Sequence, residues 1–161
     1  MTQDDVTQDD VVAELSIQER LYPQLTCFGC GHANARGLKL RSYPREDVVV
    51  AAFRPWPEHD NGFGFLNGGI IATVLDCHSG AAVFHRAHQL GMEPPPGAPL
   101  LYVTAGLDLR YLRPVPLGHE LELRSAVTEA DANQVTVEAE LVWDGKPRAA
   151  ATTLWKRWRP R

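Results

Sequence analysis

The stretch NGGIIATVLDCHSG, residues 67–80, decides how the rest of the chain is interpreted. It opens a segment from Gly68 to Leu90 that is almost free of helix breakers and that stops at Gly91, shortly before three consecutive prolines. This pattern predicts one long helix. Because its first half is apolar on nearly all sides, we expect the helix to be buried rather than to lie on a surface.

Strands are predicted on both sides of this helix. One β-branched, apolar strand precedes it, and after residue 100 the hydrophobic period changes from helical spacing to two. Short turns join the later strands, one of them at Asp144 and Gly145. We therefore expect an α+β fold, in which a largely antiparallel sheet wraps around the helix. The expected strands are Val48–Phe53, Leu101–Leu112, a segment around Leu121–Val127, Val135–Trp143 and Arg148–Trp158.

The N-terminal residues differ in composition from the rest. The chain has 161 residues and 44% hydrophobic content, which suits one globular domain. Residues 1–20 hold six acids against one base and contain TQDDV twice. A flexible acidic tail is therefore expected over 1–20 and the folded domain over 21–161. A short helix is expected over Val11–Leu21, capped by Thr7 or Ser16.

Charge and cysteine content exclude several classes of function. The chain has 20 acidic and 16 basic residues, and 14 of the acids and 15 of the bases lie outside the tail. The folded part is therefore nearly neutral, and no broad basic surface for nucleic acid is expected. Three cysteines, an odd count, and the lack of a secretion signal indicate a cytoplasmic protein. The longest apolar stretch, around Ile70, is broken by Asp76 and His78, so no membrane span is expected.

Asp76 is a carboxylate in an apolar helix. No Lys or Arg follows it along the helix until Arg86, so its charge has no local partner. Burial without a partner raises the pKa of a carboxyl group toward the range in which it acts as a general base. The alternative is that Asp76 is partly solvated, or that a neighbouring backbone amide satisfies it.

The start of the helix offers a second chemical feature. Asn67, Gly68 and Gly69 bring a polar side chain and two bare backbones to a helix N-terminus, where N–H groups lack intrahelical acceptors and can stabilise an oxyanion. The two glycines could equally serve only a tight turn. Gly68 and Asp76 are about 12 Å apart along the helix, so one chain cannot present both to one reacting carbon. Two helices antiparallel across a two-fold axis near Ala72 could, so a catalytic chain is expected to be an obligate dimer.

These segments resemble the hot-dog-fold acyl-CoA thioesterases of the phenylacetate-pathway (PaaI) type. The resemblance runs through CFGCGHANARGLKL (27–40), NGFGFLNGGIIATVLDCHSG (61–80) and LDLRYLRPVPLGHELELRS (107–125), and it covers most of residues 26–158. It implies a long central helix wrapped by a curved antiparallel sheet. It also implies that two chains pair into one continuous sheet, as a homodimer or a dimer of dimers, with active sites across the pair.

The resemblance also implies roles for individual residues. Asp76 would be the general base or nucleophile, and the Gly68 amide would polarise the thioester carbonyl from the partner chain. Asn61 would orient the water or the thioester, and Thr104 would face the carboxylate. Asn67 stands where the family has a histidine, nine positions before the acid. An amide can donate to a carbonyl oxygen but cannot carry a proton.

The function that this resemblance implies is hydrolysis of an acyl-CoA or related acyl thioester without a metal or organic cofactor. The competing interpretation is a non-catalytic protein that binds acyl thioesters or other hydrophobic ligands and that lost its chemistry with the change to Asn67. A third interpretation is a small zinc-binding module, because Cys27, Cys30 and His32 form C-x-x-C-x-H. A structural zinc site needs four ligands, so no metal is expected.

The remaining cysteine and the helix histidines receive structural interpretations. Cys77 is expected to be a small core residue, because it points about 100° away from Asp76 around the helix. Three histidines on the helix are also expected to be structural: His78, His85 and His88.

Overall fold

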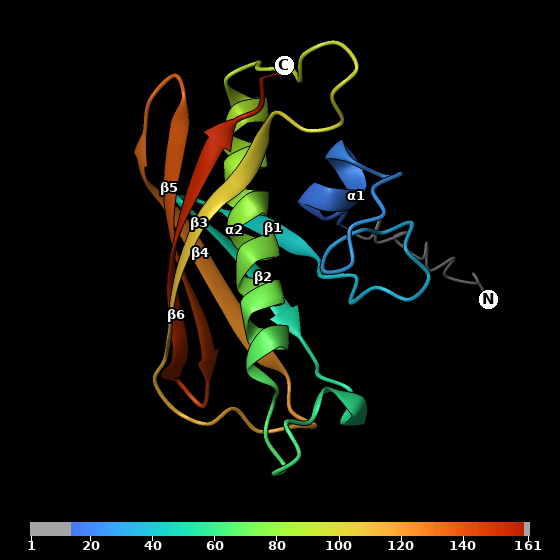
Figure 1. Cartoon of the computed structure of the whole chain (residues 1–161), viewed down its shortest axis with the longest axis vertical. Helices are drawn as coiled ribbons and strands as arrows, with labels where there is room; N and C mark the ends of the chain where they lie inside the picture. Colours follow the sequence, from blue (N-terminus) through green and yellow to red (C-terminus); the bar gives the residue numbers. More distant parts are fainter. Residues whose placement is uncertain (1–13, 160–161) are drawn as a thin grey trace, which may run out of the picture.

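The computed structural model describes residues 14–159, in which one long helix lies along a six-stranded antiparallel sheet (Figure 1). The order along the chain is α1 (Ile17–Leu21), β1 (Ser42–Arg45), β2 (Val48–Phe53), η1 (Pro57–His59), α2 (Gly68–Gln89), β3 (Tyr102–Tyr111), β4 (Leu121–Ala130), β5 (Gln134–Trp143) and β6 (Lys146–Arg157). The expected α+β architecture, one central helix against a largely antiparallel sheet, is confirmed.

The strand order in the sheet is β1-β2-β4-β5-β6-β3, and every neighbouring pair is antiparallel. Helix α2 connects β2 to β3, which lies at the far edge of the sheet, so the helix crosses the sheet that it packs on (Figure 1). Strands β4, β5 and β6 then fill the sheet between β2 and β3, joined to one another by two hairpins. Strand β3 pairs with β6 on one side and leaves its other edge open within the described residues.

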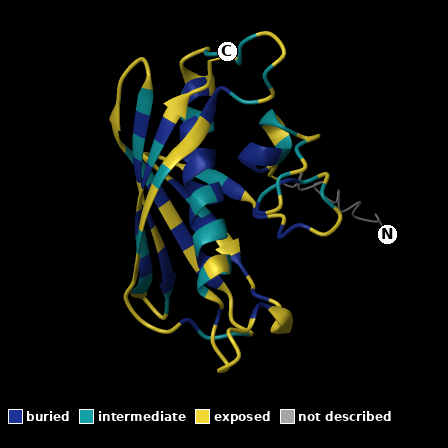
Figure 2. Ribbon diagram, viewed as in Figure 1, coloured by how far each residue is buried: buried dark blue, intermediate teal, exposed yellow. Residues whose placement is uncertain are grey.

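The core lies between α2 and one face of the sheet. Strand β5 alternates buried and more exposed residues along most of its length, as the period of two predicts. The middle of α2 is buried where it meets the sheet (Figure 2). The helix backbone approaches the sheet closely at Gly80, where an added Cβ would lie 2.8 Å from the Trp155 ring, so only glycine fits there.

Most predicted element boundaries agree with the structure. The long helix ends as expected, with Gly91 at a positive φ of 66° directly after the cap. The strand Val48–Phe53 is confirmed as β2. Asp144 and Gly145, both at positive φ, form the turn between β5 and β6.

Strand β1 was not expected from the sequence. It has four residues, contains Pro44 and lies at the edge of the sheet next to β2. A proline interrupts the alternating pattern that identifies a strand, and it is tolerated there because an edge strand needs no N–H on its free side.

The predicted N-terminal helix is shorter than expected and begins later. Its N-cap is Ser16, whose hydroxyl accepts from the Glu19 N–H while the Glu19 carboxylate accepts from the Ser16 N–H. The alternative cap Thr7 and the rest of residues 1–13 lie outside the described residues. Because Ile17 is buried, the boundary expected at residue 20 falls inside an element that packs on the domain.

None of the helices within residues 14–159 combines the length and the apolar composition that a membrane crossing requires.

A buried polar chain ties α1 and β1 to α2. The Gln18 amide donates to Ser42 Oγ (3.1 Å), and Ser42 Oγ lies 2.9 Å from His78 Nδ1. His78 Nε2 lies 3.0 Å from the Val49 carbonyl oxygen, so the neutral ring donates at Nε2 and accepts at Nδ1. His78 is therefore structural, as expected.

Burial lowers the pKa of His78 from its ordinary value of 6.5 to about 4. The unfolded chain therefore binds a proton at a higher pH than the folded one, and the stability that His78 contributes is present above pH 6.5 and is lost as the pH falls toward 4.

We expect the free energy of unfolding in urea to fall by on the order of 3 kcal/mol over this range on account of His78 alone. His78→Gln is expected to be less stable at neutral pH but to show a flatter dependence, whereas the surface control His88→Gln keeps the wild-type slope. Parallel curves for wild type and His78→Gln would contradict this assignment.

Candidate active site

Asp76 lies in the third turn of α2, half-buried, with one carboxylate oxygen held by a strand residue. Thr104 Oγ1 donates to Asp76 Oδ1 at 2.8 Å. Strand β3 shifts its register against β6 between Thr104 and Gly106, a bulge next to the residue that faces the carboxylate. The two residues that the sequence analysis expected to face each other are thus in direct contact.

Burial raises the pKa of Asp76 above its ordinary value, as the sequence analysis expected. The Thr104 hydrogen bond opposes this shift, and the negative charge at Cys27 adds to it. Since Thr104 occupies Oδ1, the second oxygen, Oδ2, remains available to accept a proton or to attack.

The Asp76 carboxylate opens into a cavity of about 250 Å³ under α1. Most of the cavity wall is apolar, and aromatic residues from the end of α1, from α2, from β3 and from β6 contribute to it: Tyr22, Phe84, Tyr102 and Trp155. A thioester with a small or aromatic acyl group could therefore bring its carbonyl carbon close to the carboxylate while the acyl group is removed from water.

Asn67 is the N-cap of α2, and its side chain has a structural partner. Asn67 Oδ1 accepts from the Gly69 N–H at 2.7 Å, which satisfies one of the free amides of the helix start. The N–H of Gly68, by contrast, has no acceptor within residues 14–159. Gly68 is therefore the amide at this terminus that is free to bind an oxyanion.

Tyr111 is a site residue that the sequence analysis missed. Its hydroxyl donates to the Gly68 carbonyl at 2.9 Å, and an added Cβ on Gly68 would lie 3.1 Å from that hydroxyl. This contact holds the Gly68 peptide in place and explains why the position suits glycine. No local sequence pattern predicts the contact between Tyr111 and Gly68, because the two residues are 43 positions apart.

Asn61 lies on the same side of the molecule as Gly68. Its Oδ1 accepts from the Phe63 N–H (2.9 Å) and the Phe65 N–H (3.3 Å), which shapes the loop before α2. Asn61 and Gly68 line one open cavity of about 600 Å³, together with Asn67, Gly69 and Tyr111. The side-chain amide nitrogen of Asn61 makes no hydrogen bond within the described residues and is free to donate.

The five expected site residues therefore fall into two groups within one chain. Asp76 and Thr104 line one cavity, whereas Asn61, Asn67 and Gly68 line another. Neither group contains both an acid and a free oxyanion donor, so one chain does not hold a complete site for acyl transfer.

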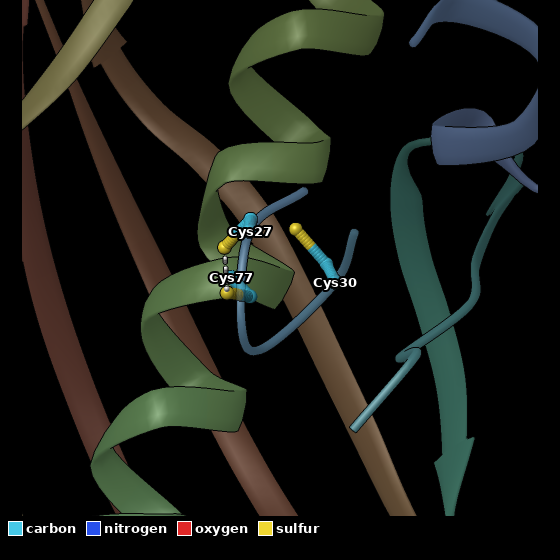
Figure 3. A group of neighbouring side chains, drawn as sticks. All are labelled: Cys27, Cys30 and Cys77. Carbon is cyan, nitrogen blue, oxygen red and sulfur yellow. Dashed lines mark hydrogen bonds between the residues drawn. The ribbon is translucent and has the colours of Figure 1, made fainter. Parts of the chain in front are cut away.

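The cysteines and histidines are arranged differently from the C-x-x-C-x-H interpretation. His32 Nε2 lies 3.7 Å from a Glu19 carboxylate oxygen, away from the thiols. Cys77 is buried, as expected, but its Sγ lies 3.7 Å from Cys27 Sγ, with Cys30 close by (Figure 3). The cysteine cluster thus recruits a residue of α2 in place of the histidine.

Replacing Thr104 by Val removes the donor to Asp76 while the side-chain volume is kept. We expect the pKa of Asp76 to rise further, because the hydrogen bond that favours the carboxylate is lost. The carboxyl signal followed by carbon NMR against pH measures this shift, and Thr152→Val, on an exposed position of β6, is the matched control. An unchanged Asp76 titration in Thr104→Val would show that the hydrogen bond has no electrostatic influence.

Comparisons with known proteins match the chain to one family. The family model described as the thioesterase superfamily matches residues 63–151, a segment that includes Gly68, Asp76 and Thr104. A thioesterase superfamily protein from Shewanella loihica has a similar structure, with 33% identity, a TM-score of 0.60, and coverage of 80% of this chain and 98% of that one. A phenylacetic acid degradation-related protein from Ralstonia eutropha, 24% identical with a TM-score of 0.65, covers 88% and 98% and shares the fold.

A curated relative matches a smaller part of this chain and is longer. The acyl-coenzyme A thioesterase THEM4 of Xenopus laevis is 27% identical over 96 residues, which are 60% of this chain. The match spans only 38% of the length of that relative.

Proposed function

The chain belongs to the thioesterase superfamily, and from that membership we propose that it hydrolyses acyl-CoA thioesters at a site formed by two copies of the chain. Its fold is the hot-dog fold that the sequence analysis expected. In the proposed site Asp76 of one protomer acts as general base or nucleophile, and Gly68 of its partner supplies the oxyanion donor.

The observation that carries the proposal is the separation of the two half-sites on one helix. The acid lies in one cavity and the free amide lies in another, about two turns of helix away. An antiparallel copy of α2 across a two-fold axis brings the amide of each chain to the acid of the other. Every copy then completes its partner's site.

The helix face between the half-sites suits such a contact. Gly69, Ala72, Thr73 and Asp76 recur at helical spacing and are less buried than the opposite face of α2. Two of these side chains are small or absent, and Thr73 Oγ1 donates to the Gly69 carbonyl, which leaves little polar surface to desolvate.

Strand β3 supports the same arrangement. Its free edge carries partly exposed apolar residues, with Val103 and Leu107 each more than a third exposed. An open edge with apolar side chains is suited to pairing with another strand. Pairing of β3 with the partner's β3 would extend the sheet and place the two α2 helices side by side.

The chemistry follows from the positions of the groups. The Asp76 carboxylate accepts a proton from water as the water oxygen attacks the thioester carbonyl carbon, or Oδ2 attacks that carbon itself. The carbonyl oxygen becomes an oxyanion and accepts from the Gly68 N–H. The carbon–sulfur bond then breaks, and CoA leaves as its thiolate and takes up a proton. In the first route the acyl group leaves as the acid. In the second route the acyl group stays on Asp76 as an anhydride, which water hydrolyses to release the acid and restore Asp76.

Asn61 and Asn67 have positioning roles in this proposal. Asn61 lines the cavity that contains Gly68, and its side-chain amide nitrogen can donate to the thioester or to water. Asn67 fixes the helix start through its bond to Gly69. Because that capping role requires no proton transfer, an asparagine is compatible with hydrolysis at this position.

The three free thiols found among the described residues are typical of a reducing compartment, and we propose that the protein acts in the cytoplasm as a homodimer or a dimer of dimers.

The Gly68 N–H can be removed without removing the helix. Gly68→Pro lacks the donor, and proline is tolerated at the first helical position after a residue as extended as Asn67 (φ −59°, ψ 135°). We expect kcat to fall about 100- to 1,000-fold in acyl-CoA hydrolysis followed by a thiol reagent. Gly68→Ala is the matched control, because it adds a Cβ near Tyr111 but keeps the N–H. Equal rates for the two variants would remove Gly68 from the mechanism.

Two inactive variants are expected to restore one another if the site is shared. Asp76→Asn keeps the shape of the acid but not its charge, and alone it is expected to lose at least about 100-fold in kcat. Unfolding and refolding it with an equal amount of Gly68→Pro gives hybrid dimers in which one of the two sites is intact, so about a quarter of wild-type activity is expected to return.

Activity of the mixture that stayed at the level of its parents would refute a shared site. Wild-type protein that binds acyl-CoA but releases no CoA would instead support the non-catalytic binder.

A further inference from the structure

Three cysteine sulfurs converge beside the proposed catalytic cavity. Cys27 and Cys30 come from the loop after α1, and Cys77 comes from α2 (Figure 3). All three Sγ atoms lie within 4.8 Å of one another, and Cys27 Sγ lies 3.7 Å from Cys77 Sγ. The three residues also line the cavity that contains Asp76.

The conformation of the loop after α1 places the sulfurs of Cys27 and Cys30 against α2. The Gly31 N–H donates to the Cys27 carbonyl at 2.8 Å, which closes the turn between the two loop cysteines. An added Cβ on Gly29 would lie 2.3 Å from Cys77 Sγ, and one on Gly31 would lie 2.4 Å from the Cys27 nitrogen. Gly29 is thus required for the approach of the loop to α2, and Gly31 for the turn within the loop.

The distance between Cys27 Sγ and Cys77 Sγ is close to that between two thiolates on one metal ion. With zinc–sulfur bonds of about 2.3 Å, tetrahedral geometry separates two ligand sulfurs by about 3.8 Å. A disulfide would instead join two sulfurs at about 2.05 Å. The contact between Cys27 and Cys77 therefore matches one edge of a thiolate tetrahedron.

We propose that Cys27, Cys30 and Cys77 bind one thiophilic metal ion, zinc(II), as a three-thiolate site in the wall of the cavity. The fourth coordination position is left for water or a small ligand. Three sulfur ligands select soft or borderline ions over magnesium or calcium. The site goes beyond the proposed hydrolysis and takes no part in it, so either can fail without the other.

Metal-free protein, prepared with a chelator and a reductant that does not bind metal, allows a direct measurement. Titration with zinc against a chromophoric chelator is expected to show one ion per chain, with release of protons in weakly buffered solution. Cobalt(II) in place of zinc is expected to give thiolate-to-metal charge-transfer absorption. Loss of a residue that only hydrogen-bonds to a metal ligand weakens metal binding by about 10- to 100-fold. Because Cys27 and Cys30 would be ligands themselves, Cys27→Ser and Cys30→Ser are each expected to weaken zinc binding by more than that.

Two further variants separate this site from the alternatives. His32→Gln is the matched control, because His32 belongs to the C-x-x-C-x-H pattern but lies against Glu19, so zinc affinity is expected to be unchanged. Asp76→Asn is expected to lose hydrolysis and to keep zinc binding, which distinguishes failure of the metal site from failure of the proposed function.

The proposal is overturned if wild type and Cys27→Ser bind zinc equally, or if His32→Gln loses affinity as the cysteine variants do. It is also overturned if zinc leaves the alkylation rates of the three thiols unchanged. Because Cys77 is buried and its replacement can disturb folding, the alkylation assay on wild-type protein tests its role without a substitution.

Discussion

Close packing of α2 on the sheet is the constraint on which the other features depend. Val74 and Leu75 are fully buried beneath the helix, and Gly80 allows the Trp155 ring to approach the helix backbone. Each fully buried Val or Leu side chain contributes about 1.5–3 kcal/mol relative to an exposed one. With one face of α2 held against the sheet, the opposite face must carry the polar and small residues, and Asp76 lies on it. The position of the carboxylate thus follows from the packing of the other face.

Two segments bring chemical groups to α2: strand β3 at the edge of the sheet and the loop after α1. Strand β3 brings the Thr104 hydroxyl to the middle of the helix and the Tyr111 hydroxyl to its first turn. The loop after α1 brings two thiols to Cys77. A single helix therefore organises an acid, an amide and a thiol cluster along its length, and their separation is fixed by the rise of the helix.

Local patterns in the sequence were sufficient for features that depend on neighbouring residues. The extent of α2 follows from its breakers, β2 from its β-branched run and the β5–β6 turn from Asp144 and Gly145. Asp76 stood out because a carboxylate is costly in an apolar helix. Contacts between residues far apart in the sequence could not be predicted from local patterns. Tyr111 reaches Gly68 across 43 positions and Cys77 reaches Cys27 across 50, and β1 gains its strand character by pairing with β2.

Helix α1 is only five residues long, yet it forms part of the enclosure around Asp76. Ile17, Gln18 and Tyr22 line the cavity, and the Gln18 side chain anchors this segment through Ser42. A recombinant protein that started at residue 21 would retain every residue assigned to chemistry and still be open to solvent on that side. The carboxylate would then be rehydrated, and the apolar acyl group would lose a wall of its binding site. Shortening this chain at its N-terminus is therefore a change to its active site.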